Sequence, residues 1–268
     1  MLKDITLGQY FPGDTVVHRL DPRTKLLLTI VYIAALFTAN TPVGYALVFA
    51  ALVLFAALGH IPAKALLKGL KPLIFIIVFT AILNLFFTQG DDYIFRWHAV
   101  KMTWTGLRNA VAMVVRVMLL VSGTFLLTYT TSPLAITDGL ESLLSPLKKL
   151  KVPVYELSLM MSIALRFIPT LIEETDRIMS AQKARGADLE TGSLLQRAKA
   201  LLPLLIPLFV SSFRRADELA TAMECRCYNG GEGRTRMKVL KMAARDVWAL
   251  LIGAALMAGV IVLRKLGI

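Results

Sequence analysis

The chain has 268 residues, of which 56% are hydrophobic, and its mean hydropathy is +0.65. Soluble domains are only about 45–50% apolar, and the apolar residues here are concentrated in blocks, so the composition predicts an integral membrane protein rather than a soluble one. The formal net charge of +12 is interpreted first as membrane topology, because the basic residues do not cluster with stacking aromatic side chains as they do in nucleic-acid-binding proteins.

Two uncharged apolar runs, 26–40 and 43–59, follow each other closely and predict a tight helical hairpin. Asp21 and Pro22 fit the N-cap and the first position of the first helix. Both runs are short for a hydrocarbon core of about 30 Å, which a helix crosses in about 20 residues. We therefore expect flanking turns or local thinning of the bilayer to make up the difference.

Residues 60–129 contain two further apolar stretches, each preceded by a more polar segment. Residues 60–72 are predicted to be a basic connector, 73–87 a third span, and 89–105 a mixed polar loop. The fourth apolar stretch, 106–129, contains Arg116. A charge at this depth is costly unless the side chain is paired or faces protein or water, so we expect such a partner for Arg116.

The charge distribution predicts the orientation. The short 60–72 connector carries three lysines and no acidic residue, which places it on the cytoplasmic side. The N-terminus and residues 131–245 are then cytoplasmic as well, and 89–105 lies outside. With a last span over 247–263, the predicted fold class is all-α, with about five membrane spans and a cytoplasmic domain of long helices. Three regions follow: an N-terminal transmembrane region, 1–130; a cytoplasmic helical domain, 131–245; and a C-terminal span, 246–268.

The region between the fourth and last spans has three predicted helices, at about 134–149, 154–185 and 193–226. The last two are unusually long, and each changes character along its length. Their first halves are mostly apolar and their second halves are polar. The first halves therefore favour protein or a membrane interface, and the second halves favour water or a charged partner.

An internal repeat relates these two long helices. ETDRIMSAQKARG matches RADELATAMECRC at an offset of 41 residues, with the shared frame D-x-x-x-[ST]-A-x-x-x-R. The frame begins at Asp176 and Asp217 and ends at Arg185 and Arg226. Nine residues place Asp and Arg on opposite sides of a helix, so no pair between them is expected and each arginine is free to face outward.

Two interpretations of these arginines remain open. A cation in the last turn of a helix stabilises the helix dipole, and this alone accounts for a single arginine. Two long helices that end in the same frame favour a second interpretation, in which each arginine contacts one of two similar copies of a partner. Arginine suits this role because its charge is permanent and its planar group binds carboxylates or carbonyls in a fixed orientation.

Motifs for catalysis are absent from the sequence. No G-x-x-x-x-G-K-[ST] loop is present, so no ATP hydrolysis by that route is expected, and no catalytic residue, cofactor or metal site is predicted for the chain. The C-x-C pair Cys225 and Cys227 is the only candidate for metal ligands. No histidine lies nearby in sequence, which favours a reduced cytosolic pair.

At three places the sequence resembles the transmembrane T component of energy-coupling factor (ECF) transporters, prokaryotic importers of vitamins and metals. LDPRTKLL (20–27) resembles the opening signature of that family, and residues 166–188 and 214–238 resemble its two Ala-Arg-Gly helices. The resemblance implies a non-catalytic subunit in the cell membrane of a prokaryote. It further implies two ATPase partners, A and A′, which use ATP and Mg, and a separate membrane protein, the S component, which binds the substrate.

Site residues follow from the same resemblance. Ala184-Arg185-Gly186 and Cys225-Arg226-Cys227 are the expected ATPase contacts, and the second departs from Ala-Arg-Gly at both flanking positions. Gly230 and Gly231 are therefore expected to supply the turn after Arg226. The candidate contacts with the S component, for which packing within this chain is the alternative, are Met160, Met161, Ala164, Phe167, Leu204 and Leu208.

One alternative function belongs to a different class. A self-contained permease or channel with a regulatory cytoplasmic domain would also combine membrane spans with polar helices. It predicts transport by the purified chain in liposomes without ATPases.

Overall fold

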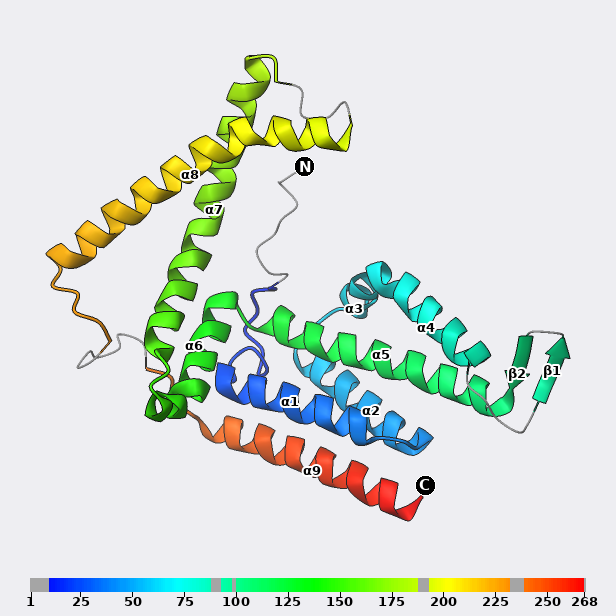
Figure 1. Ribbon diagram of the computed structural model, residues 1–268. Coiled ribbons are helices and arrows are strands. Elements are labelled where there is room, and N and C mark those ends of the chain that lie inside the picture. Colours follow the sequence, from blue (N-terminus) through cyan, green and yellow to red (C-terminus); the bar gives the residue numbers. More distant parts are fainter. Residues whose placement is uncertain (1–9, 88–92, 98–99, 188–192, 232–238, 268) are drawn as a thin grey trace. The chain divides into compact units, whose positions relative to one another are not determined.

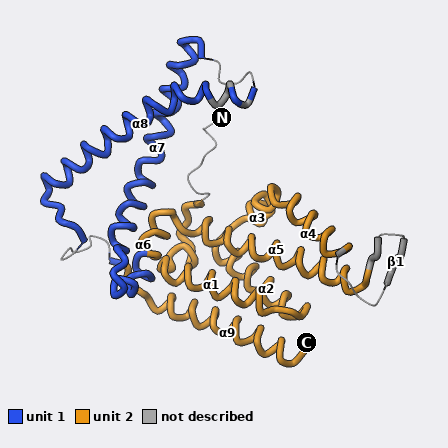
Figure 2. The backbone as a smooth tube through the Cα atoms, viewed as in Figure 1, with its two compact units in different colours: residues 1–7, 141–239 blue, residues 8–140, 240–268 orange. Residues whose placement is uncertain are grey.

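The computed structural model describes residues 10–87, 93–97, 100–187, 193–231 and 239–267. The chain folds as two compact units, one built on residues 141–239 and the other on residues 8–140 with 240–268 (Figure 2). Apart from one short hairpin of strands, the described residues are helical or lie in connections (Figure 1). The all-α prediction is therefore confirmed.

Helices of the larger unit follow the predicted apolar runs. Asp21 caps the first helix, since its carboxylate accepts a hydrogen bond of 2.9 Å from the backbone N–H of Arg23, and Pro22 takes the first helical position, as predicted. Thr41 caps the second helix in the same way. The helices are α1 (Pro22–Thr38), α2 (Pro42–Leu58), α3 (Ala63–Leu70), α4 (Ile74–Phe87), α5 (Trp104–Thr130) and α9 (Ala244–Leu266), and α6 (Pro133–Leu144) begins in this unit and ends in the smaller one.

The core of this unit lies where α1, α2, α5 and α9 pack together. Small residues allow the close approaches that helix packing in membranes uses. A Cβ atom added at Gly123 of α5 would lie 2.2 Å from the ring of Tyr32, and one at Gly253 of α9 would lie 2.5 Å from Leu28. The hydroxyl of Tyr32 then donates to the carbonyl of Leu119 at 2.9 Å. The buried core residues are Ala35, Leu36, Ala39, Tyr45, Val48, Leu52, Leu119 and Val260.

Two connections differ from their predictions. The basic connector over 60–72 contains helix α3, because its Ala-, Leu- and Lys-rich sequence favours a helix; a 3₁₀ turn, Lys71–Leu73, joins it to α4. The loop predicted for 89–105 contains the antiparallel strands β1 (Tyr93–Trp97) and β2 (Val100–Thr103). β-Branched and aromatic residues in these stretches favour strands, a signal that the loop prediction passed over.

Arg116 of α5 has partners through one nitrogen of its guanidinium, whereas its buried Nε has no hydrogen-bond partner among the described residues. Its guanidinium donates to the hydroxyl of Tyr45 at 2.6 Å and to the carbonyl of Ala39 at 3.3 Å. It also lies over the rings of Phe37 and Tyr45, with 6.0 and 5.7 Å to the ring centroids. Arg116 therefore joins α5 to the α1–α2 turn, as the cost of an unpaired charge predicts.

The smaller unit contains the two long helices. The helix predicted over about 134–149 is shorter than expected: α6 ends at Leu144 and a 3₁₀ helix, Ser145–Leu150, follows, because Pro146 cannot donate the hydrogen bond that would continue the α-helix. α7 (Val154–Ala184) and α8 (Leu194–Cys225) agree with the predicted long helices to within a residue at each end. Their internal prolines are Pro169, Pro203 and Pro207.

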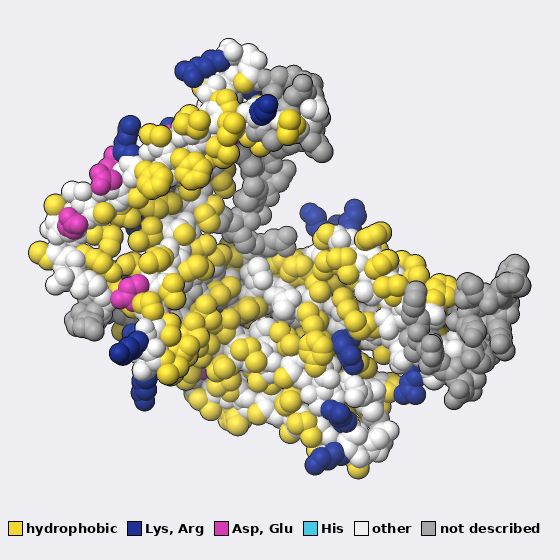
Figure 3. Space-filling view, viewed as in Figure 1, with side chains coloured by type: hydrophobic (Ala, Val, Ile, Leu, Met, Phe, Trp, Pro, Cys, Tyr) yellow, Lys and Arg dark blue, Asp and Glu magenta, His cyan; other side chains and the backbone are white. Residues whose placement is uncertain are grey.

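Length and apolar composition identify candidate membrane spans within the described residues. The segments that qualify are Ala63–Phe86, α5, α7 and α9, and α2 is a shorter apolar helix. α1 and α2 each have 17 residues, so both are short for a bilayer, as predicted. Hydrophobic side chains cover much of the visible surface of each unit, as expected for a polytopic membrane protein (Figure 3).

Candidate functional site

The first arginine end, Ala184-Arg185-Gly186, closes α7 with a complete set of capping hydrogen bonds. Gly186 has φ +86°, and its N–H donates to the carbonyl of Lys183 at 3.0 Å. The N–H of Ala187 donates to the carbonyl of Gln182, also at 3.0 Å. These two bonds define a Schellman motif, in which the residue after the cap takes the left-handed conformation that glycine adopts without strain. Arg185 is the cap residue, and its side chain is exposed.

The second arginine end, Cys225-Arg226-Cys227, closes α8 in the same way. The N–H of Cys227 donates to the carbonyl of Glu224 at 2.8 Å, and the N–H of Tyr228 to that of Met223 at 3.0 Å. Cys227 has φ +57°, so it occupies the left-handed position that Gly186 occupies in α7. Both helices thus end in one geometry, and both arginines stand at the same position within it.

The turn after Arg226 is made by Cys227 itself rather than by Gly230 and Gly231. Gly231 has a separate structural role, because a Cβ atom there would lie 2.4 Å from the ring of Tyr155. A non-glycine residue in the left-handed region pays roughly 1–2 kcal/mol of backbone strain. The Cys-Arg-Cys sequence therefore keeps the backbone of Ala-Arg-Gly at some cost in stability.

α7 and α8 run antiparallel and meet at residues that the 41-residue repeat makes equivalent. Glu174 and Arg215 occupy matching positions and form a half-buried ion pair of 2.8 Å. On one side of this pair, the Nε2 of Gln182 donates to the carbonyl of Pro203 at 3.2 Å. The offset of 41 relates that contact to positions 223 and 162 on the other side of the ion pair. There Met223 and Ile163, the residue next to position 162, line the same groove. The helix pair thus has an approximate two-fold symmetry centred on Glu174 and Arg215.

This symmetry places the arginine ends at opposite ends of the helix pair. Arg185 lies 11 residues beyond Glu174, and Arg226 lies 11 residues beyond Arg215. At 1.5 Å per residue, each arginine is about 16 Å from the centre, and the two are about 30 Å apart. Figure 1 shows the two helices crossing and the free ends pointing apart. Such an arrangement places two equivalent guanidinium groups at opposite ends of the helix pair.

Both arginines are exposed, and neither forms an ion pair within the described part of the chain. Cys225 and Cys227 beside Arg226 are free thiols and are also exposed. Among the described residues, no group of three or more His, Cys, Asp or Glu side chains is placed to hold a metal ion. The chemistry that remains at each end is that of an exposed guanidinium on a capped helix.

The candidate S-component contacts divide into two groups. Met160 and Met161 are 63% and 52% exposed, and Ala164 is exposed as well. Leu204 is only 7% exposed, whereas Phe167 and Leu208 are half-buried. Phe167 faces a groove of about 270 Å³ between α7 and α8, together with Leu171 and Leu219 and their neighbours. The first group is therefore available to another protein, whereas the second is partly or fully buried within the chain, with Phe167 in the groove between α7 and α8.

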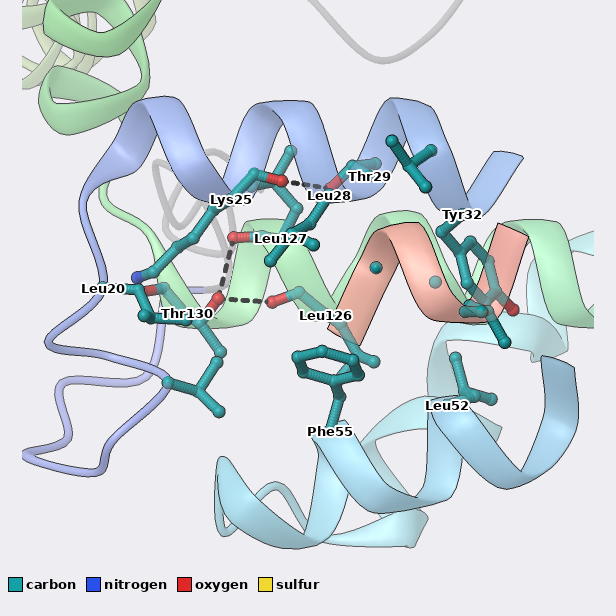
Figure 4. Close-up of a pocket in the computed structure, with 15 residues that line it drawn as sticks. Leu20, Lys25, Leu28, Thr29, Tyr32, Leu52, Phe55, Leu126, Leu127 and Thr130 are labelled. Carbon is teal, nitrogen blue, oxygen red and sulfur yellow. Dashed lines mark hydrogen bonds between the residues drawn. The ribbon is translucent and has the colours of Figure 1, made fainter. Parts of the chain in front are cut away.

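A second cluster was not predicted from the sequence as a unit. Lys25 lies at one end of a partly open pocket of about 80 Å³ among α1, α2, α5 and α9 (Figure 4). Its ammonium donates to the carbonyl of Thr130 at 2.8 Å. Asp21 and Asp246, also buried, lie at the helix starts beside it. The only sequence signal was that Asp21 and Lys25 belong to the LDPRTKLL segment.

Comparison with known proteins gives a consistent result. Residues 13–237 match the model of the CbiQ family, described as a cobalt transport protein. Three similar relatives are each named energy-coupling factor transporter transmembrane protein EcfT. The protein of Ruminiclostridium cellulolyticum is 51% identical over 98% of both chains. That of Acidaminococcus fermentans is 53% identical over 96% of this chain and 95% of its own length, and that of Bacillus subtilis 48% over 96% and 98%.

Proposed function

Because this chain belongs to the CbiQ family, as a non-catalytic EcfT transmembrane component of an energy-coupling factor transporter, we propose that its two arginine ends dock two ATPase subunits, A and A′. The long helices α7 and α8 then pass the movement of the ATPases to a separate S component that binds the substrate. ATP and Mg are used by the ATPases, and the S component selects the vitamin or other micronutrient that is imported.

The observation that carries this proposal is the match between the two arginine ends. Two exposed guanidinium groups on identically capped helices, about 30 Å apart by helix rise, fit two similar partner subunits better than one. Stabilisation of the helix dipole accounts for one cation at one helix end. It does not account for two arginines that end matching helices and are both exposed, with no ion pair among the described residues. The exposed Met160, Met161 and Ala164 on the apolar half of α7 are the surface that we assign to the S component, since methionine adapts to different partners.

Orientation is part of the proposal. We place the N-terminus and residues 131–245 on the cytoplasmic side of a prokaryotic cell membrane. Although α7 is long and apolar enough to cross a bilayer, we assign its apolar half to contact with the S component. The lysine-rich segment around α3 supports this, because short cytoplasmic connections are enriched in basic residues. The ATPases are then within reach of both arginine ends.

Charge reversal at the two ends tests the docking. Arg185→Glu and Arg226→Glu are expected to lower co-purification of the ATPases at least tenfold each, since a charged hydrogen-bonded contact is worth about 1.5–3 kcal/mol. The double variant should abolish uptake of the substrate. Arg177→Glu in α7 and Arg214→Glu in α8 are matched controls, because both residues are exposed and lie away from the helix ends. Wild-type ATPase retention by both single variants would contradict the assignment.

A further inference from the structure

The LDPRTKLL segment (20–27) takes no part in the proposed docking, yet it lies where three helices of the larger unit come together. It begins α1 and lies beside the C-terminal end of α5 and the N-terminal end of α9. Two of its side chains, Asp21 and Lys25, are charged and almost fully buried. Burying a charge is costly unless the group is paired and hydrogen-bonded, so this segment carries a cost that a purely apolar junction avoids.

Lys25 fastens the end of α5. Lys25 is only 6% exposed. Its ammonium donates to the carbonyl of Thr130 at 2.8 Å and to that of His18 at 3.1 Å. Thr130 is the last residue of α5, where the helix leaves carbonyls without an intrahelical partner and carries the negative end of its dipole. An ammonium satisfies both needs at once.

Asp246 fastens the start of α9. One carboxylate oxygen accepts from the backbone N–H of Asp21 at 2.8 Å, and the other accepts from the N–H of Ala243, also at 2.8 Å. Asp246 is 1% exposed and stands in the first turn of α9, where a negative charge is favoured by the helix dipole. The start of α9 is thus bound to the backbone that begins α1.

α6 also packs against this segment. A Cβ atom added at Gly139 would lie 2.9 Å from the side chain of Pro22 and 3.2 Å from that of Leu26. Glycine therefore allows α6 to approach the first turn of α1 closely. α5 is the last helix before the chain passes to the unit built on 141–239, α6 carries the chain across that boundary, and α9 is the first helix after it returns.

We propose that Lys25, Asp21, Asp246 and the Thr130 carbonyl form a clasp that holds both chain connections of the coupling helices to α1. Lys25 and Asp246 are its positioning residues: they touch neither substrate nor ATPase, and they make the membrane helices follow the movement of α7 and α8. Because hydrogen bonds are directional, they hold the ends of α5 and α9 in fixed positions against α1 when α7 and α8 move. Apolar contacts alone would let these ends slide. This inference rests on the proposed function, since it concerns how docking is transmitted.

The test separates coupling from docking. Lys25→Met and Asp246→Asn are introduced into the complete transporter, with its ATPases and S component, and reconstituted in liposomes. Uptake and ATP hydrolysis are measured on the same sample. The ATPases should co-purify as with the wild type, and the ratio of uptake to hydrolysis should fall at least tenfold. Lys25→Arg keeps a donor for the carbonyls and should restore part of the ratio. Lys68→Met, at an exposed lysine of α3, is the control and should leave the ratio unchanged.

Two outcomes would overturn the clasp. The first is an unchanged ratio in Lys25→Met and Asp246→Asn. The second is a parallel fall of uptake, hydrolysis and the amount of folded complex, which would reduce the cluster to a structural role. If the wild-type chain itself failed to retain ATPases, the docking proposal would fail instead. The clasp would then be tested on the purified chain by hydrogen exchange: Asp246→Asn should accelerate exchange of the Asp21 and Ala243 amides, and unchanged exchange would refute it.

Discussion

At the scale of single residues, the two arginine ends differ in sequence but not in backbone geometry. Gly186 adopts φ +86° without strain, whereas Cys227 adopts φ +57° with a side chain attached. Because the Cys227 side chain is exposed, it gains little from packing that could offset this strain. The backbone at the end of α8 therefore gives no reason for a cysteine rather than a glycine at this position.

Replacing Cys227 by glycine should stabilise the protein. Cys227→Gly removes the left-handed strain and is expected to raise the free energy of unfolding by about 1 kcal/mol. Cys225→Gly is the matched control, because Cys225 is the last helical residue of α8 and glycine inside a helix costs about 0.5–1 kcal/mol. Thermal unfolding of the purified chain measures both changes. A loss of stability in Cys227→Gly would show that the thiol contributes an interaction that the strain argument omits.

At the scale of elements, the approximate two-fold symmetry of α7 and α8 gives the internal repeat its structural meaning. The ion pair between Glu174 and Arg215 joins repeat-equivalent positions, which is possible only near the centre of an antiparallel pair. Equal distances from this centre then make the two arginine ends equivalent. The prolines inside the helices do not end them, since both helices continue past Pro169 and Pro207.

A distance measurement checks this arrangement. Spin labels at Ala184→Cys and at the native Cys225 mark equivalent positions of the repeat, and Cys227→Gly removes the other thiol. Pulsed electron resonance should give a distance of about 30 Å, as expected for ends that are each 11 residues from the centre. Labels at Glu174→Cys and Arg215→Cys, with both native cysteines replaced by serine, provide the short-distance control. A distance below about 20 Å between the two ends would exclude the antiparallel arrangement, for which the helix rise alone predicts the longer value.

At the scale of the whole molecule, two units of different chemistry share one chain. The larger is built around apolar helices, and the charged groups within its helix packing, such as Arg116 and Lys25, have hydrogen-bond partners. The smaller exposes both apolar and charged side chains along α7 and α8. The proposed docking of ATPases and of a membrane protein requires both kinds of surface.

The proposed orientation can be tested with the native cysteines. Cys225 and Cys227 are free and exposed, so a membrane-impermeant maleimide should label them in inside-out vesicles and not in right-side-out cells. Asp91→Cys, in a chain whose native cysteines are replaced by serine, should show the opposite pattern, because the 89–105 segment is predicted outside. Labelling of Cys225 and Cys227 in intact cells would reverse the assigned orientation.

Local patterns in the sequence determined the elements and the family. Hydrophobic runs, the Asp21–Pro22 start and the repeat ending at Arg185 and Arg226 all depend on residues close together in the chain, so they are readable without a fold. For the same reason, the ends of α7 and α8 were predicted to within a residue. The hairpin at 93–103 was not predicted, because its β-branched and aromatic residues stand among the polar residues that favoured a loop.

Only the tertiary structure decided which groups meet. The Lys25 ammonium binds a carbonyl 105 residues away, and the Asp246 carboxylate binds an amide 225 residues away. Two partners of Arg116, the carbonyl of Ala39 and the hydroxyl of Tyr45, are 77 and 71 residues away. No periodic pattern encodes such pairs, because they follow from how the helices pack. The left-handed conformation of Cys227 likewise became visible only in the backbone, since its sequence departs from the glycine that this position favours.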